Sequence, residues 1–561
     1  MIDLSVVIPT YNRAKRLRAC LDALSVQTQA TSDFEVIVVI DGSTDETVEI
    51  LKNFDAPFLL RTVFQKNSGQ PSALNNGINQ AKGRYCLFID DDIVADPRLV
   101  TEHLRTQHQH PKVVVVGQIT LSLPVNAGWY TRAFAQGWRD HYDQLNQGTI
   151  PITWEDCYSG NMSAPREALL ACGGFALNLV RGYDVELAKR LENQGCSLVY
   201  RPNALGCQDE QKGFWELSQD AEKAGKVDVM LYSQDPQMLS QALASFSQDS
   251  WRKLLLRRWL LALNIQPKFL ELLGRLIRNP ARKQSWYGIT QTFCYWRGVR
   301  DIAVKKGIWR QLTSGTPILM YHAMGLPTES AGPFVMPPKR FAAQMEWLKR
   351  TGYHPITLEQ FLDCQRARRF PPARSVVVTF DDGYADNHTY AYPVLRQHNI
   401  PITIFLVSGC VGFTNHWDTG GQLSGRPLMS WSQIQDMAAQ GVQFGAHSKT
   451  HPVLTAVSTI RAKEEISGSR RELEEKLGGA VTLFAYPYGE YNPVIQALVQ
   501  ETGCTASCTV NPGLNTLITP CFSLRRAEVQ GTDSLIRFFL VLWLGDGEAF
   551  WWRRNQDHTA S

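Results

Sequence analysis

The chain has 561 residues, of which 44% are hydrophobic and 20% are charged, and its formal net charge is +4. At this length we expect about three or four domains, because a single hydrophobic core does not extend over so many residues. The twelve cysteines are scattered and form no CxxC pair, which excludes a disulfide framework and indicates reduced thiols.

No stretch of the chain has the length of a membrane span. A span needs about 20 apolar residues, and the longest apolar run, FFLVLWL at 538–544, is less than half as long. The N-terminus is not typical of a secretory signal, because its basic residues follow a short apolar run instead of preceding it. We expect a cytoplasmic protein, with peripheral attachment at the inner membrane face as an additional expectation.

The first 214 residues alternate short apolar runs with helical patterns. This alternation predicts a parallel α/β sheet, with buried strands within 4–12, 34–45 and 85–92. In such sheets ligands bind beyond the carboxyl ends of the strands. Asp41 and the run Asp90–Asp92 fall at such ends.

The three adjacent aspartates are hard to explain as structure alone. A single acid at a strand end is often a helix cap, but three neighbouring carboxylates repel one another unless a cation or hydrogen-bond donors offset their charge. Hard oxygen ligands favour Mg²⁺ or Mn²⁺, and such sites are commonly completed by phosphate oxygens.

Six ordered motifs in this part resemble the family 2 glycosyltransferases, which share a GT-A fold and use nucleotide sugars. They are VVIPTYNR, VIDGSTDET, NSGQPSALNNGI, FIDDDIVADP, SGNMSAPREALLACGGF and GYDVELAKRL, and they cover about residues 1–210. The resemblance implies that Thr10, Tyr11 and Asp41 contact the nucleoside. It also implies that Asp90 belongs to the sugar-nucleotide site.

The same resemblance implies a metal ligand and a base. Asp92 would hold Mg²⁺ or Mn²⁺, and Asp184 would take the proton of the acceptor hydroxyl in an inverting reaction. Two departures are visible: Tyr183 precedes Asp184 where relatives have glutamate, and 207–209 read Cys-Gln-Asp where many relatives have a histidine near the metal. The chain has no QxxRW segment, so we expect non-processive transfer.

Residues 215–312 read as a helical, strand-poor and basic connector. Residues 251–310 hold fourteen lysines and arginines against two acidic residues, whereas the rest of the chain has 43 basic and 51 acidic residues. One interpretation is a solvated basic face. The other is an amphipathic surface on anionic lipid, since Trp and Leu accompany the charge. No nucleic-acid-reading module is recognisable, so we expect no nucleic acid partner.

The last part, 313–561, again alternates strands with helices and predicts a deformed β/α barrel. His447 and His451 are four residues apart, a spacing that brings two imidazoles to one metal. Asp381 and Asp382 end an earlier strand. A His₂Asp set is a usual zinc site, and the second carboxylate can serve as the base for the attacking water.

This segment is similar to the polysaccharide deacetylases of carbohydrate esterase family 4. TFDDGY, HSKTH and FAYPYG match three motifs within about 315–535. The resemblance implies that Asp381 is the base, that Asp382, His447 and His451 bind Zn²⁺ or a similar divalent metal, and that the N–H of Tyr488 holds the oxyanion.

Two expected side chains are missing from their usual motifs. The third motif normally has an arginine that orients the base, and Ala485 stands there. The late motif reads SLRRAEV, without the usual histidine acid. ILMYHAMG resembles the opening of a permuted subgroup in which an early histidine is the acid, which makes His322 the candidate. As a lone histidine at a strand end it could equally be a hydrogen-bonded core residue.

The sequence therefore predicts a bifunctional carbohydrate enzyme with domains at 1–214 and 313–561. The expected donor is a UDP-sugar, UDP-N-acetylglucosamine, because the neighbouring activity removes acetyl groups. The expected acceptor is a glycan or glycolipid. The alternative is that one domain is active and the other is a glycan-binding or scaffolding module.

Overall fold

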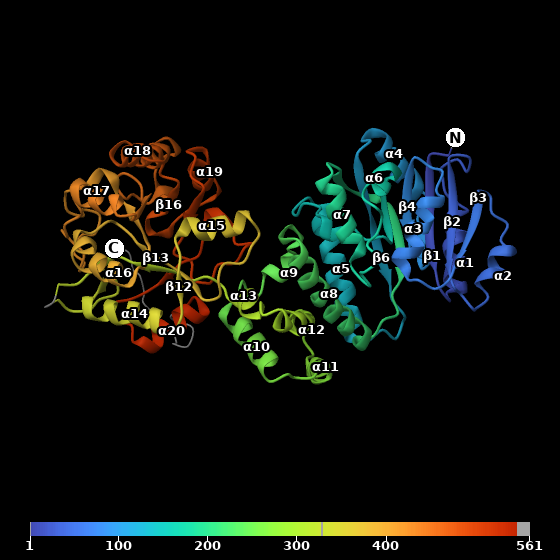
Figure 1. Ribbon diagram of the computed structural model, residues 1–561, viewed down its shortest axis with the longest axis horizontal. Helices are drawn as coiled ribbons and strands as arrows, with labels where there is room; N and C mark the ends of the chain where they lie inside the picture. Colours follow the sequence, from blue (N-terminus) through green and yellow to red (C-terminus); the bar gives the residue numbers. More distant parts are fainter. Residues whose placement is uncertain (1, 327–328, 547–561) are drawn as a thin grey trace. The chain divides into compact units, whose positions relative to one another are not determined.

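The computed structural model describes residues 2–326 and 329–546, which form two units (Figure 1). The first unit contains the chain up to Ser240 together with Asn264–Ile302, and the second contains Gln241–Leu263 and the chain from Ala303 onward. The end of the predicted deacetylase domain, 547–561, lies outside the described residues.

The first unit is built on an eight-stranded sheet in the order β3-β2-β1-β4-β7-β6-β8-β5. Strands β1 to β4 pair in parallel, as the sequence predicts, whereas β7 runs antiparallel to β4 and β6. The strands are β1 (Leu4–Thr10), β2 (Phe34–Asp41), β3 (Leu59–Gln65), β4 (Tyr85–Ile89), β5 (Ile93–Ala95), β6 (Val113–Ser122), β7 (Asn161–Pro165) and β8 (Ser197–Asp209).

Helices cover both faces of this sheet, which explains why its central strands are continuously apolar. Successive residues of β1 point to opposite faces: Val6 and Ile8 belong to one buried cluster, and Val7 belongs to another. The helices are α1 (Ala14–Leu24), α2 (Thr47–Lys52), α3 (Gln70–Gln80), α4 (Leu99–Gln109), α5 (Trp129–Asn146), α6 (Arg166–Ala171) and α7 (Tyr183–Asn193).

The predicted connector is helical, but its helices are divided between the two units. Helices α8, α11 and most of α12 belong to the first unit, and α9, α10 and α13 belong to the second. The bounds are α8 (Phe214–Gln234), α9 (Gln241–Ala244), α10 (Trp251–Ala262), α11 (Pro267–Leu276), α12 (Pro280–Lys305) and α13 (Trp309–Thr313).

The second unit is a barrel-like sheet in the order β17-β16-β15-β14-β13-β9-β18, all paired in parallel. Leu524 forms a parallel bridge with Cys508 of β17, and β18, three residues later, pairs with β9, so this segment joins the two ends of the sheet. The predicted deformed barrel is confirmed. Its strands are β9 (Ile318–Tyr321), β13 (Ser375–Phe380), β14 (Ile402–Leu406), β15 (Gln443–Ala446), β16 (Leu483–Ala485), β17 (Ala506–Cys508) and β18 (Ala527–Glu528).

Short strands and helices complete this unit, and the helices lie outside the strands (Figure 1). They are β10 (Ala323–Met324), β11 (Val335–Met336), β12 (His354–Pro355), α14 (Pro338–Arg350), α15 (Leu358–Arg366), α16 (Tyr392–His398), α17 (Trp431–Ala439), α18 (Thr459–Leu477), α19 (Pro493–Glu501) and α20 (Leu535–Leu544). The FFLVLWL run lies in α20, where Phe538, Val541 and Leu542 join the core. None of the described helices combines the length and apolar character that a membrane span requires.

Candidate functional sites

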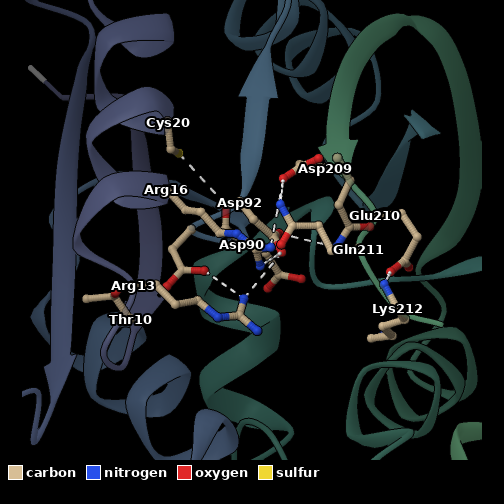
Figure 2. Close-up of polar contacts among 12 residues, drawn as sticks. Thr10, Arg13, Arg16, Cys20, Asp90, Asp92, Asp209, Glu210, Gln211 and Lys212 are labelled. Atoms are coloured by element: carbon tan, nitrogen blue, oxygen red, sulfur yellow. Dashed lines mark hydrogen bonds and ion pairs between the residues drawn. The ribbon is translucent and has the colours of Figure 1, made fainter. Parts of the chain in front are cut away.

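The first site lies at the carboxyl ends of β1 and β4, which are neighbours in the sheet (Figure 2). Thr10 is the last residue of β1, and the three aspartates follow β4 directly. The Thr10 hydroxyl donates to Asp91 Oδ2 at 2.8 Å. The structure therefore brings together two segments that the sequence assigned to one nucleotide-sugar site.

Two arginines that the sequence analysis did not assign also reach these aspartates (Figure 2). Arg13 Nη1 lies 3.0 Å from Asp91 Oδ1 and 3.3 Å from Asp92 Oδ2. Arg16 Nη1 lies 3.5 Å from Asp92 Oδ2. The basic residues directly after the first strand could have indicated them in the sequence. The start of α1 lies next to the strand ends, so side chains there can reach the aspartates.

The carboxylates retain an excess of negative charge in spite of these arginines. Burial, and then the charges of Asp92, Asp91 and Asp184, raise the pKa of Asp90 to about 7. A divalent cation would relieve this repulsion, so the donor set fits a hard metal ion. In the segment 207–209, where the sequence analysis found no histidine, Gln208 Nε2 donates to Asp92 Oδ1 at 3.2 Å.

Asp41 and Tyr11 have different surroundings at this edge of the sheet. Asp41 is buried, and its oxygens accept hydrogen bonds from the N–H groups of Ser68 and Gly69 at 2.8 and 2.9 Å and from Gln65 Nε2 at 2.8 Å. This carboxylate therefore orders the loop before α3. The Tyr11 side chain is about half exposed and free to meet a ligand.

Asp184 lies in the first turn of α7 and completes this site. Its carboxylate accepts from Ser159 N–H at 3.2 Å and from Val185 N–H at 3.0 Å. Burial raises the pKa of Asp184, and its charge contributes to the raised pKa of Asp90. The raised pKa makes Asp184 a better proton acceptor near neutral pH.

The second site contains a compact set of metal-ligand atoms from Asp382, His447 and His451, all buried. Asp382 Oδ1 lies 3.6 Å from His447 Nε2 and 3.4 Å from His451 Nε2, and the two Nε2 atoms are 3.2 Å apart. His447 Nδ1 donates to the carbonyl of Ala485 at 2.8 Å, and this tautomer leaves Nε2 as an acceptor.

The chemistry of these three groups fits a divalent metal ion. Burial lowers the pKa of both histidines, so the rings are neutral and can act as ligands. The two histidines lie on a loop after β15 and not on a helix, and His451 has the left-handed φ of 60°. Asp382 is also left-handed, with φ 70°. Such strained residues concentrate at functional sites.

Asp381 differs from its neighbour because it is paired with a buried arginine. Arg526 donates from Nη1 to Asp381 Oδ1 at 2.6 Å and from Nη2 to Oδ2 at 2.7 Å, and its side chain is fully buried. Burial opposes ionisation of Asp381, but the charge of the Arg526 guanidinium and its two hydrogen bonds lower the pKa of Asp381 to about 2. The orienting arginine that is missing at Ala485 is supplied from the barrel-closing segment.

His322 follows β9 and lies close enough to the second site to interact with its charges. Burial lowers the pKa of His322 to about 4; the charge of Asp381 opposes this shift and that of Arg526 adds to it. Its ring packs edge-on against Phe334 at 5.0 Å. The structure therefore places the candidate acid with the candidate base, and the ring is neutral near pH 7.

Two aromatic side chains enclose His451. Tyr488 packs edge-on against the His451 ring at 4.6 Å, which places the predicted oxyanion residue at the site. Trp417 stacks on the same ring at 4.7 Å. Sequence reasoning missed Trp417, because the loop that carries it has no strand or helix pattern.

Comparisons with known proteins divide the chain in the same way. Residues 5–172 match the Glycosyl transferase family 2 model, and residues 368–507 match the Polysaccharide deacetylase model. The Bacillus subtilis protein YxkH, whose name describes it as a polysaccharide deacetylase, is 28% identical to this chain over 38% of this chain and 71% of its own length. Glycosyltransferase AglE of Haloferax volcanii is 26% identical over 43% of this chain and 77% of its own.

Among solved structures, the Streptococcus pyogenes deacetylase PplD is 23% identical, with a TM-score of 0.36 over 41% of this chain and 98% of that chain. The family models and the curated relatives each cover one part of the chain, and the described sites fall in those two parts. The chain therefore joins a family 2 glycosyltransferase domain to a polysaccharide deacetylase domain, two enzymes in one polypeptide.

Proposed function

We propose that the two domains act in sequence on one amino sugar. The first transfers an N-acetylhexosamine from a UDP-sugar, UDP-N-acetylglucosamine, to a glycan or glycolipid acceptor, and the second removes the acetyl group from the transferred residue. The observation that carries the proposal is the buried Asp382–His447–His451 set beside an Asp381 that has its own arginine. This arrangement separates a metal ligand from a base.

The residues divide the deacetylation between them. A divalent ion at the second site, which we take to be zinc, would polarise the amide carbonyl and acidify a bound water. Asp381 stays ionised and accepts the water proton as the C–O bond forms, while the Tyr488 N–H holds the oxyanion. His322, neutral at rest, receives this proton from Asp381 and passes it to the nitrogen as the C–N bond breaks, which leaves acetate and an amine.

The reaction of the first domain needs a base for the acceptor hydroxyl and positive charge beside the leaving diphosphate. Asp184 accepts the proton of the acceptor hydroxyl as it attacks the anomeric carbon from the face opposite the diphosphate, so the configuration inverts. Mg²⁺ or Mn²⁺ held by Asp92 would neutralise the departing diphosphate. Arg13 and Arg16, which pair with these aspartates, would add positive charge for the same phosphate oxygens. Asp90, Thr10, Tyr11 and Asp41 surround the nucleotide.

The domain limits and cellular location complete the proposal. We assign 1–214 to the transferase, 215–312 to a helical connector shared by the two units, and 313–561 to the deacetylase. Lipid-linked acceptors would place the enzyme peripherally at the inner membrane face. The basic residues within 251–310 favour this location, because anionic lipid headgroups attract them.

A donor and metal panel tests the proposal. The purified chain is incubated with nucleotide sugars and a cell lipid extract, and sugar transfer and acetate release are measured with and without chelator. We expect UDP-N-acetylglucosamine to be the best donor. We also expect chelation to stop acetate release and added Zn²⁺ to restore it. Transfer without any acetate release, on every N-acetylated substrate and with zinc present, would instead support the alternative of a non-catalytic second domain.

A further inference from the structure

The structure changes which basic residues of the connector can meet a partner. Arg257 is buried in the second unit, where it donates to the Phe246 carbonyl and pairs with Asp249. Arg258 donates to the Trp543 carbonyl at 3.0 Å and packs on that ring. These two guanidinium groups are committed to the fold. A partner surface has to be sought elsewhere in the connector.

Helix α11 (Pro267–Leu276) has an apolar face that no other described part of the first unit covers. Phe269, Leu272, Leu273 and Leu276 are 53%, 50%, 49% and 77% exposed. Their spacing of i, i+3, i+4 and i+7 places them on one side of the helix. Single exposed apolar residues are ordinary, whereas four on one helical face mark an interaction site.

The opposite face anchors α11 to the first unit. Leu270 and Gly274 are buried, and the Trp286 indole donates to the Leu270 carbonyl at 2.8 Å. A side chain at Gly274 would collide with Trp129, since a Cβ there would lie 2.2 Å from the Trp129 ring. The helix is therefore held tightly by one face, and the exposed leucines are not simply a frayed segment.

Basic residues border the exposed apolar face. Lys268 and Arg275 lie, by the helical period, between the buried and the exposed faces. Arg278 follows in the loop after α11, and Arg282 and Lys283 lie at the start of α12. The only acid in 266–283 is Glu271, which is buried and paired with Arg275 at 2.6 Å. The surface around the apolar face is thus cationic.

We propose that α11 lies in the interface of an anionic lipid bilayer, with Phe269, Leu272, Leu273 and Leu276 among the acyl chains. An apolar face bordered by lysine and arginine is the pattern of helices that lie in the membrane plane. A protein partner that matched this surface would need an apolar patch bordered by acidic residues. An anionic lipid bilayer offers apolar acyl chains and negative headgroups in one surface. The inference extends the proposed function, because such a helix would hold the transferase unit beside a lipid-linked acceptor.

Vesicle binding tests this without using either reaction. The full chain is mixed with phosphatidylcholine vesicles with or without phosphatidylglycerol, and the bound fraction is measured by flotation. We expect binding only to the anionic vesicles. The triple variant Phe269→Ser, Leu272→Ser, Leu276→Ser should lower the partition coefficient at least about tenfold, because three apolar side chains no longer insert.

A matched control replaces three exposed apolar residues elsewhere in the first unit, Val26→Ser, Leu59→Ser and Val125→Ser, and should bind as the wild type does.

Leu273→Trp should show a blue-shifted tryptophan emission on anionic vesicles. The proposal would be overturned if the wild-type chain did not bind anionic vesicles, or if the triple variant bound them as strongly as the wild type does. So would light scattering that shows a dimer broken by the triple variant, because the face would then be a self-association surface. Sugar transfer to a soluble acceptor should be unchanged in all variants, which separates this test from the proposed activities.

Discussion

Neighbouring aspartates in this chain acquire different properties from their partners. In the second site, Asp381 and Asp382 are adjacent and both buried, yet the pKa of Asp381 falls to about 2 and that of Asp382 rises to about 7. Burial raises both values, but only Asp381 has the Arg526 guanidinium on its two oxygens. Asp381 is thereby kept ionised and can act as a base, whereas Asp382 lacks a counter-charge and can bind a cation.

Replacing Arg526 tests this division of roles. In Arg526→Met the buried Asp381 loses its counter-charge, so its pKa should rise and the acid limb of the deacetylase pH profile should move to higher pH. The variant should also lose about 3–5 kcal/mol of stability, because it leaves an unpaired buried carboxylate. Acetate release between pH 4 and 9 and a thermal melt measure both effects.

Arg526→Lys is the control, since it retains the charge and loses the two-pronged hydrogen bond. We expect its acid limb to remain closer to that of the wild type. Identical pH profiles for the Met variant and the wild type would contradict the assignment, whatever the change in stability.

The sequence could predict the site residues that lie at or just after strand ends, because apolar runs followed by acids or by paired histidines are local patterns. Asp92, Asp382 and the His447–His451 pair are of this kind. Arg526 could not be found in this way, since it is 145 residues from Asp381 and reaches it only through closure of the barrel. Trp417 was equally hidden, because it acts through a ring contact and not through a motif.

At the scale of elements, the helical region between the domains is more than a linker. Helices α8 and α12 cross so closely that two glycines are required: a Cβ at Gly225 would lie 2.2 Å from the Tyr295 carbonyl oxygen, and one at Gly298 would lie 1.9 Å from the Glu222 carbonyl oxygen. The sequence predicts these helices from their periodicity. It could not reveal the crossing, because nothing in 215–312 marks those glycines as different from others.

The substitution Gly298→Ala should therefore destabilise the first unit by about 1–3 kcal/mol, the usual cost of overpacking. Gly288→Ala on the same helix is the matched control, since a Cβ there meets no atom within 4 Å. That change should be neutral or stabilising by about 0.5–1 kcal/mol, because alanine is the better helix former. Thermal unfolding compares the two, and equal midpoints would argue against a tight crossing.

At the scale of the whole molecule, one placement of carboxylates serves two chemistries. Both domains present acids at the carboxyl ends of parallel strands, and that part of the fold follows from the sequence. The side chains around these acids differ. Arginines and further carboxylates lie beside Asp90–Asp92, whereas His447 and His451 lie beside Asp382. The order of the two reactions does not follow from either site alone, because it depends on the shared product.

The mass of the sugar added to the acceptor tests the central claim most directly. Wild type, Asp184→Asn and Asp382→Asn are each incubated with UDP-N-acetylglucosamine, divalent metal and acceptor, and the products are weighed by mass spectrometry. The account predicts a hexosamine added by the wild type, an N-acetylhexosamine added by Asp382→Asn, and no addition by Asp184→Asn. A hexosamine product from Asp382→Asn, or an acetylated product from the wild type after complete transfer, would contradict it.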